Sequence, residues 1–213
     1  MQPSSPGYPI QFDVDHPDRP RNRATTLFRL ILAIPILIVL VMIGAVGSDI
    51  DASGGAWFAC IAIAPGVLFI PALLLIVFRQ KYPRWWFDFN LAYLRFHNRV
   101  IAYLLLLGDE YPSSDEEQNV HLDVPYPDAR VDLNRWLPLV KWFLAIPHYI
   151  VLILLDVGVV LAAIATWFAI VVTRRHPRPL FNFTVGAMRW HNRVIGYAFA
   201  LVTDEYPPFR LSV

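Results

Sequence analysis

The chain has 213 residues, of which 56% are hydrophobic, and its mean hydropathy of +0.46 is too high for an ordinary soluble domain. A net charge of +1 gives no indication of nucleic-acid binding. The single cysteine, Cys60, excludes an internal disulfide and a cysteine-based metal cluster. Because the apolar residues come in blocks, the composition predicts an integral membrane protein.

Polar and proline-rich residues fill positions 1–25, which we expect to form a cytoplasmic N-terminal arm. Four apolar stretches follow, each a candidate for crossing a bilayer that requires about 20 apolar residues. They cover residues 26–47, 56–78, 137–155 and 157–172. The first two stretches and the last two each form a pair, and no Lys or Arg lies in the short segment that connects the members of a pair. The positive-inside rule therefore predicts that both termini and the linker between the pairs are cytoplasmic.

A further helix is predicted after each pair, over residues 84–107 and 178–202. Pro83 and Pro177 stand just before these helices, where proline is tolerated. Each helix carries two arginines near its middle, and each arginine would cost roughly 2.5–3.5 kcal/mol at the centre of a bilayer. We therefore expect amphipathic helices that lie on the cytoplasmic surface of the membrane.

Several motifs occur twice in the chain. His-Asn-Arg-Val-Ile at 97–101 recurs at 191–195, Asp-Glu-Tyr-Pro at 109–112 recurs at 204–207, and Leu-Ala-Ile-Pro at 32–35 recurs at 144–147. These recurrences predict an N-terminal arm (1–25), repeat 1 (26–112, with a hairpin insertion near 48–63), a linker (113–135) and repeat 2 (136–213). The predicted fold class is an all-α integral membrane protein with two tandem repeats. Each repeat is a transmembrane helical hairpin followed by an amphipathic interfacial helix, which gives four transmembrane helices.

The recurring arginines are the strongest candidates for a binding site. They are Arg95 and Arg99 in the first copy and Arg189 and Arg193 in the second. Spacing of i, i+4 places both arginines of a copy on one helix face, and a guanidinium binds phosphate or carboxylate with two hydrogen bonds. The pattern favours a contact with lipid headgroups or with a carboxylate of a partner. The alternative is simple interfacial anchoring by snorkelling arginines.

Acidic pairs end the same two helices, as Asp109 and Glu110 and as Asp204 and Glu205. Acids at a helix C-terminus oppose the helix dipole, so their recurrence needs a reason. We expect them to form structural ion pairs with arginines of their own or of the other copy. The alternative is that they are solvated turn residues.

His97 and His191 lie on the predicted helices nearly opposite the arginines. Such a pair could bind a metal or relay protons, but histidines of this kind are more often hydrogen-bonded packing residues, so we interpret them as buried polar groups. His148 has Ile36 as its counterpart and is not expected to be part of a shared site.

Motifs of the common enzyme classes are not found: there is no glycine-rich phosphate loop, no His-Glu-x-x-His and no nucleophile elbow. The sequence therefore predicts no enzyme, no catalytic residue, no cofactor and no metal.

A family resemblance rests on motifs along nearly the whole chain. They are Phe-Asp-Val-Asp at 12–15, Arg-x-x-Leu-Ala-Ile-Pro at 29–35, His-Pro-Arg at 176–178, Arg-Trp at 189–190 and Thr-Asp-Glu-Tyr-Pro-Pro-Phe at 203–209. The chain resembles, in two tandem copies, a bacterial family of membrane domains of unknown function numbered 4389. This resemblance implies the architecture and no activity.

Together these observations favour a non-enzymatic scaffold or accessory subunit of a larger membrane complex. We expect it to be a multi-pass protein of the inner membrane, with anionic lipid headgroups and other membrane subunits as partners and with no nucleic acid. The alternatives are a transporter or channel for an ion or small solute, and the binding or handling of anionic lipids at the inner leaflet.

Overall fold

A computed structural model describes residues 7–17, 23–44, 66–114 and 116–212 of the chain. Within these ranges, helices alternate with two short strands. The helices are α1 (Arg23–Gly44), α3 (Gly66–Arg79), α4 (Arg84–Leu104), α5 (Pro138–Leu144), α6 (Ile146–Thr173) and α7 (Arg178–Ala198). The strands are β1 (Gln11–Val14) and β2 (Val120–Asp123).

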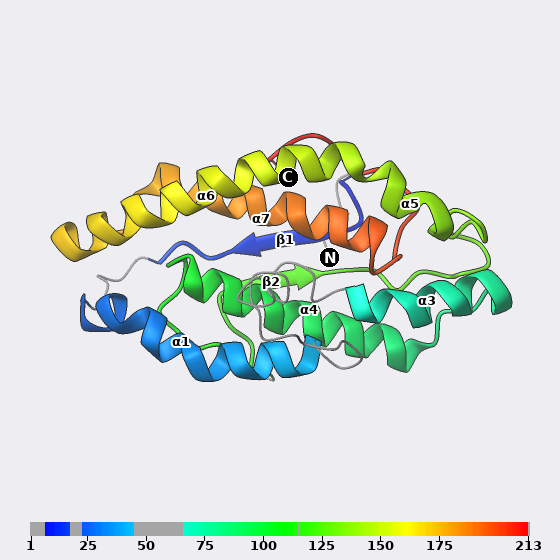
Figure 1. Ribbon diagram of the computed structural model, residues 1–213, viewed down its shortest axis with the longest axis horizontal. Coiled ribbons are helices and arrows are strands. Elements are labelled where there is room, and N and C mark those ends of the chain that lie inside the picture. Colours follow the sequence, from blue (N-terminus) through cyan, green and yellow to red (C-terminus); the bar gives the residue numbers. More distant parts are fainter. Residues whose placement is uncertain (1–6, 18–22, 45–65, 115, 213) are drawn as a thin grey trace, which may run out of the picture.

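The two strands pair antiparallel in the middle of the molecule, between α7 and α4 (Figure 1). Phe12 stands opposite Leu122 in the register, and both are buried. Residues of β1 alternate between exposed and buried, as expected for a strand with one face on a core. The sheet therefore joins two segments that are far apart in the sequence, and α4 and α7 both pack against it.

The remaining helices cover α4 and α7 from outside. α6 packs along α7, α1 packs against α4, and α5 meets α3 at one end of the molecule (Figure 1). Prolines lie at the beginnings of four helices: Pro83 and Pro177 precede α4 and α7 in extended conformation, and Pro138 and Pro147 lie in the first turns of α5 and α6. Proline is tolerated there because a first-turn N–H has no partner within the helix.

The prediction of an all-α fold with four transmembrane helices is wrong. Among the described residues, one helix, α6, is long and apolar enough to cross a membrane, and a two-stranded sheet is present. Within the described ranges, the apolar helices Thr25–Leu40 of α1 and Phe69–Arg79 of α3 are shorter than the roughly 20 residues that a hydrocarbon core of about 30 Å requires. The predicted hairpin insertion near 48–63 lies outside the described residues.

The predicted second hairpin is also wrong. The sequence predicts a turn at Asp156, between the apolar stretches 137–155 and 157–172, but α6 continues through this residue, and the helical run is interrupted at Ala145. Gly158 is kept inside the helix because α6 approaches α7 closely: a Cβ there would lie 3.0 Å from the ring of Phe183. The Asp-Val-Gly sequence therefore serves helix packing and not a turn.

α4 and α7 begin at the predicted residues, but they do not lie on the outer surface of the molecule. More than half of each helix is buried against the strands and the covering helices. Leu106 and Leu201, which follow these helices, both adopt left-handed backbone conformations, with φ of 64° and 54°. The chain therefore leaves both helices by the same turn, and the residues beyond it fold back onto the helix.

Asn98 of α4 and Asn192 of α7 form the polar centre of this arrangement. Each side-chain amide donates a 2.7 Å hydrogen bond to the oxygen of the other. Each also donates to the carbonyl four residues earlier, Leu94 at 2.8 Å and Met188 at 2.9 Å. Both side chains are 4% exposed, so every amide proton is satisfied away from water.

Replacing Asn192 with alanine should therefore destabilise the protein. The Asn98 amide would lose a partner while remaining buried, which costs about 1–3 kcal/mol. Thermal unfolding in detergent should show a melting temperature several degrees lower. The control is Asn182→Ala, on the exposed side of the same helix, which should change little.

The double variant Asn98→Ala/Asn192→Ala should lose less stability than the sum of the single variants, because both members of the pair are then gone. Additive losses would contradict a direct interaction between the two amides.

Candidate functional site

Arg95 of α4 and Arg189 of α7 each bind one strand of the sheet through equivalent hydrogen bonds. The Nε of Arg95 donates to the carbonyl of Leu122 at 3.0 Å, and its Nη2 lies 3.5 Å from Asp123. The Nε of Arg189 donates to the carbonyl of Phe12 at 2.9 Å, and its Nη2 lies 3.1 Å from Asp13. Because Phe12 and Leu122 are paired across the sheet, each arginine holds a strand that belongs to the other half of the chain.

Arg99 and Arg193 lie one turn further along and hold the segments that follow the helices. Arg99 donates to the carbonyl of Ser113 at 2.8 Å, and Arg193 donates to those of Arg210 at 3.1 Å and Ser212 at 2.7 Å. Burial, followed by the nearby charges of Arg210 and Arg189, lowers the pKa of Arg193. All four predicted contact arginines thus bind backbone carbonyls of their own chain.

Two of the four predicted acidic residues form ion pairs. Asp109 forms an ion pair with Arg29 at 2.9 Å, and Asp204 forms one with Lys141 at 2.6 Å. Glu110 and Glu205 are exposed. The two pairs correspond closely, since Arg29 also donates to the carbonyl of Gly108 and Lys141 to that of Thr203.

These two cations also lie against tyrosine rings. The guanidinium carbon of Arg29 is 4.3 Å from the centre of the Tyr103 ring, and Nζ of Lys141 is 5.1 Å from that of Tyr197. The Lys141 side chain is fully buried. Burial lowers the pKa of Lys141, while the hydrogen bond and charge of Asp204 act in the opposite direction. The basic residue near the start of each covering helix is thus tied to the far end of α4 or α7.

The two predicted histidines have different environments. His97 is buried beside Tyr93, with 6.4 Å between ring centres. His191 lies at the α6–α7 contact, with Nε2 3.2 Å from Asp156 and Nδ1 3.0 Å from the carbonyl of Ala187. Burial lowers the pKa of His191, but the hydrogen bond and charge of Asp156 outweigh it, and the pKa is raised overall.

His148 is a buried polar residue that the sequence analysis set aside. Its Nδ1 accepts a hydrogen bond from Nε1 of Trp190 at 3.1 Å, and its ring stacks on Phe209 with 4.0 Å between centres. Tyr206 adds a third aromatic contact at 4.8 Å. The sequence feature that could have identified this site is Tyr-Pro-Pro-Phe at 206–209, which ends the second copy and is missing from the first. Tyr206 and Phe209 of this segment cover His148.

No potential metal site of three or more His, Cys, Asp or Glu side chains is found in the part of the chain that the structure describes. An open hollow of about 520 Å³ lies between α1 and α4. Its walls are mainly apolar, with Ile36, Val39, Tyr93 and Phe96 among them.

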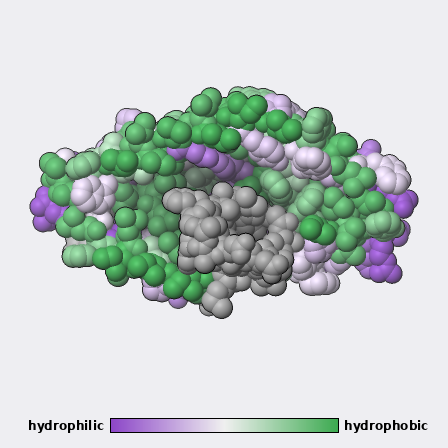
Figure 2. Space-filling view, viewed as in Figure 1, coloured by the Kyte–Doolittle hydropathy of each residue, from purple (hydrophilic) through white to green (hydrophobic). Residues whose placement is uncertain are grey.

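The outer surface of the covering helices is largely apolar. Large apolar side chains stand exposed along the helices that cover α4 and α7, as the apolar colouring along the upper edge and at the lower left shows (Figure 2). We call the exposed apolar residues of α1, α5 and α6 the outer apolar surface. On α5 and α6 they are Leu139, Val140, Trp142, Phe143, Leu144, Ile146, Ile150, Ile153, Leu154, Val157, Val160, Leu161, Ile164, Phe168 and Val172. On α1 they are Leu27, Phe28, Leu30, Ile31, Leu32, Ile34, Ile38 and Val39.

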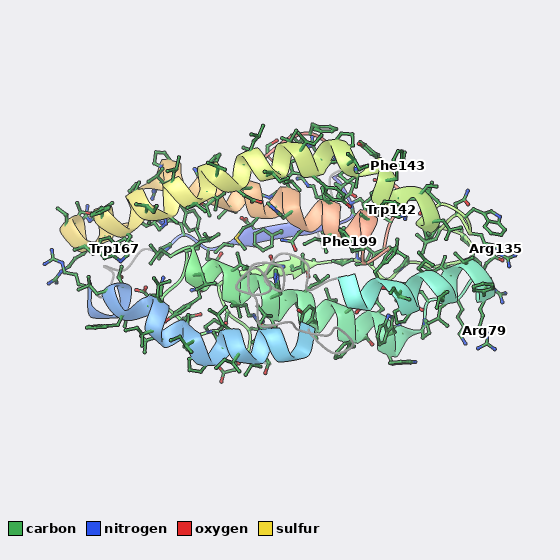
Figure 3. All side chains as sticks on the ribbon, in the orientation of Figure 1. Arg79, Arg135, Trp142, Phe143, Trp167 and Phe199 are labelled. Atoms are coloured by element: carbon green, nitrogen blue, oxygen red, sulfur yellow. The ribbon has the colours of Figure 1, made fainter. Side chains whose placement is uncertain are left out.

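Exposed basic residues gather at both ends of the long axis. Arg79 and Arg135 mark one end, and Trp167 lies toward the other (Figure 3). The first end also has exposed Lys81 and Arg84. The other end has exposed Arg23, Arg174, Arg175 and Arg178. We call these two groups the basic ends: the first consists of Arg79, Lys81, Arg84 and Arg135, and the second of Arg23, Arg174, Arg175 and Arg178.

In its described residues the protein is mostly helical, with a small two-stranded sheet, one candidate membrane helix and polar contacts buried beside an apolar core. Residues 136–210, which include α5, α6 and α7, match the model of the family described as Domain of unknown function (DUF4389). The match covers one copy. No curated protein and no solved structure matches the chain.

Replacing Lys141 with methionine should destabilise the protein by about 3 kcal/mol, because Asp204 loses the partner that compensates its charge. Chemical denaturation in detergent measures the loss. Lys81→Met, on an exposed residue, is the matched control and should have little effect. Equal effects of the two substitutions would contradict a structural role for the Lys141–Asp204 pair.

The pair of His191 and Asp156 should stabilise the protein in acid. Since the folded pKa of His191 is raised above 6.5, its contribution is fully present below that pH and is lost as the pH rises through the folded pKa. The melting temperature of wild type should therefore exceed that of Asp156→Asn more at about pH 5.5 than at about pH 8.5. A larger difference at the alkaline pH would contradict this sign.

Proposed function

We propose that the protein is a non-enzymatic membrane scaffold or accessory subunit, attached to the inner membrane through its outer apolar surface. The observation that carries this proposal is the exposure of α6. Its 28 residues include Asp156 as the single charged residue, and most of its large apolar side chains face outward. Contiguous apolar surface of this size on a monomer marks a protein or membrane contact.

The distribution of polarity supports a bilayer as the apolar partner. Several charged and amide side chains lie in the interior beside the apolar core, among them Arg29, Lys141 and Arg193, each 2% exposed or less. Soluble proteins place such groups outside, because burying a charge is costly unless it is paired. A chain with paired cations inside and Leu, Ile and Phe outside is suited to an apolar solvent.

Two tandem copies of one unit make up the proposed scaffold, with the boundaries 26–112 and 136–213. Support comes from contacts that occur in matching pairs: Asn98 with Asn192, Arg95 beside Arg189, and Arg29 beside Lys141. The strand that precedes each copy, β1 before the first and β2 before the second, is bound by the arginine of the other copy. Interlocked halves resist separation, and this rigidity is what a scaffold supplies to the subunits that dock on it.

Introducing a charge on the outer face of α6 should weaken membrane binding. In Leu154→Asp a side chain that is 69% exposed becomes acidic, which costs up to about 3 kcal/mol near the centre of a bilayer and less at its surface. Flotation with phosphatidylglycerol vesicles should show at least about tenfold weaker association. Val131→Asp is the control, since Val131 is 81% exposed but lies in the segment before α5.

Circular dichroism of both variants would show that helix content is unchanged. Equal binding by wild type and Leu154→Asp would contradict membrane attachment through α6.

The role as an accessory subunit has a separate test. Extraction in mild detergent followed by native mass spectrometry should give a stoichiometric complex with at least one further membrane protein. A monomeric protein with transport or turnover of its own would contradict the scaffold role.

A further inference from the structure

We propose that α6 lies in the plane of the membrane and does not cross it, so that both basic ends bind anionic headgroups of the same leaflet. This inference rests on the proposed membrane attachment and adds the orientation and the lipid class. It concerns the outer apolar surface and the two basic ends defined above.

The first argument is that α6 packs on α7 over much of its length. Its buried residues form one stripe: His148, Leu152, Val159, Ala162, Thr166 and Ile170. Arg23 also donates to the carbonyl of Val172 near the end of α6 at 2.8 Å, and Tyr206 donates to that of Leu144, the last residue of α5, at 3.2 Å. A crossing by α6 would therefore take α7 into the bilayer beside it.

The second argument is the position of Asp156, near the middle of α6. Its side chain is 54% exposed and pairs with His191 of α7. In a crossing helix this carboxylate would stand close to the centre of the bilayer, where a charged residue costs roughly 2.5–3.5 kcal/mol on insertion scales. At the membrane surface the same group reaches the headgroup layer and water, and the cost disappears.

Helix length gives a third argument. At about 1.5 Å per residue, α6 is roughly 42 Å long, against a hydrocarbon core of about 30 Å. A crossing would require a strong tilt or would leave apolar turns in water. No such mismatch arises for a helix that lies parallel to the surface with one face in the acyl chains.

The basic ends provide the charge complementarity. α5 and α6 together run along the long axis, with α5 at one end of the molecule and the end of α6 at the other (Figure 1), and hydrophilic residues are visible at both ends (Figure 2). In a crossing orientation one of these clusters would face the outside, against the positive-inside rule. In the in-plane orientation both meet the anionic lipids of the cytoplasmic leaflet, each charge adding about 1 kcal/mol of attraction.

Spin labels on α6 test this orientation in the full chain. In a Cys60→Ser background, Ile150→Cys, Val157→Cys and Ile164→Cys place labels on one exposed face at successive intervals of seven residues. Reconstitution uses vesicles of phosphatidylcholine with phosphatidylglycerol, and depth is measured by oxygen and nickel-chelate accessibility. We expect equal depths at all three positions. Depths that change by about 10 Å between neighbouring sites, as a crossing helix requires, would overturn the inference.

Sidedness and lipid class provide a second readout. Arg174→Cys and Arg135→Cys, one at each basic end, should react with an impermeant maleimide from the same side of cell-derived vesicles, and opposite sides would overturn the inference. The double variants Arg174→Gln/Arg175→Gln and Arg79→Gln/Lys81→Gln should each weaken binding to the anionic vesicles. Their binding to phosphatidylcholine vesicles should be unchanged. An equal loss on both lipids would overturn the headgroup assignment. Failure of the wild type to bind either vesicle would instead refute the proposed membrane attachment.

Discussion

The reciprocal amide pair of Asn98 and Asn192 is the contact on which the rest of the structure depends. Two carboxamides satisfy each other in this way only at one relative position of α4 and α7. Sliding either helix by a turn would leave buried donors and acceptors without partners, at about 1–3 kcal/mol for each group. With the helices fixed, Arg95 and Arg189 reach the strands, and the register of Phe12 opposite Leu122 follows.

Buried cations are tolerated in this core because each has several specific acceptors. Arg29 binds a carboxylate and a carbonyl and lies over an aromatic ring, and Lys141 does the same in the second half. These contacts hold the inner faces of α1 and α5 against the segments that follow α4 and α7, beside an apolar core.

Local features of the chain could be predicted from the sequence, but the long-range pairing could not. The beginnings of α4 and α7 followed from Pro83 and Pro177, because proline has a defined place in the first helical turn. Hydrophobic blocks alone gave the wrong number of spans, since an apolar stretch does not reveal whether one of its faces packs on protein.

The turn predicted at Asp156 failed for a related reason: its partner His191 lies 35 positions away in the sequence. For the candidate site, sequence spacing identified the recurring arginines, histidines and acids as a group. It could not show that Arg29 and Lys141, more than 60 positions from Asp109 and Asp204, would be the cations that pair with them.

The second half of the chain has polar contacts between its outer helix and its core that go beyond the matched ones. His148 accepts from Trp190, and Asp156 pairs with His191, so that two side chains of α6 are fixed on α7 at different heights. A helix of 28 residues whose other faces are apolar can be oriented only from its inner face. These two contacts prevent α6 from rotating about its axis, which keeps the apolar side chains directed outward. The counterpart of His148 in α1 is Ile36, a residue that contributes packing but no directional bond.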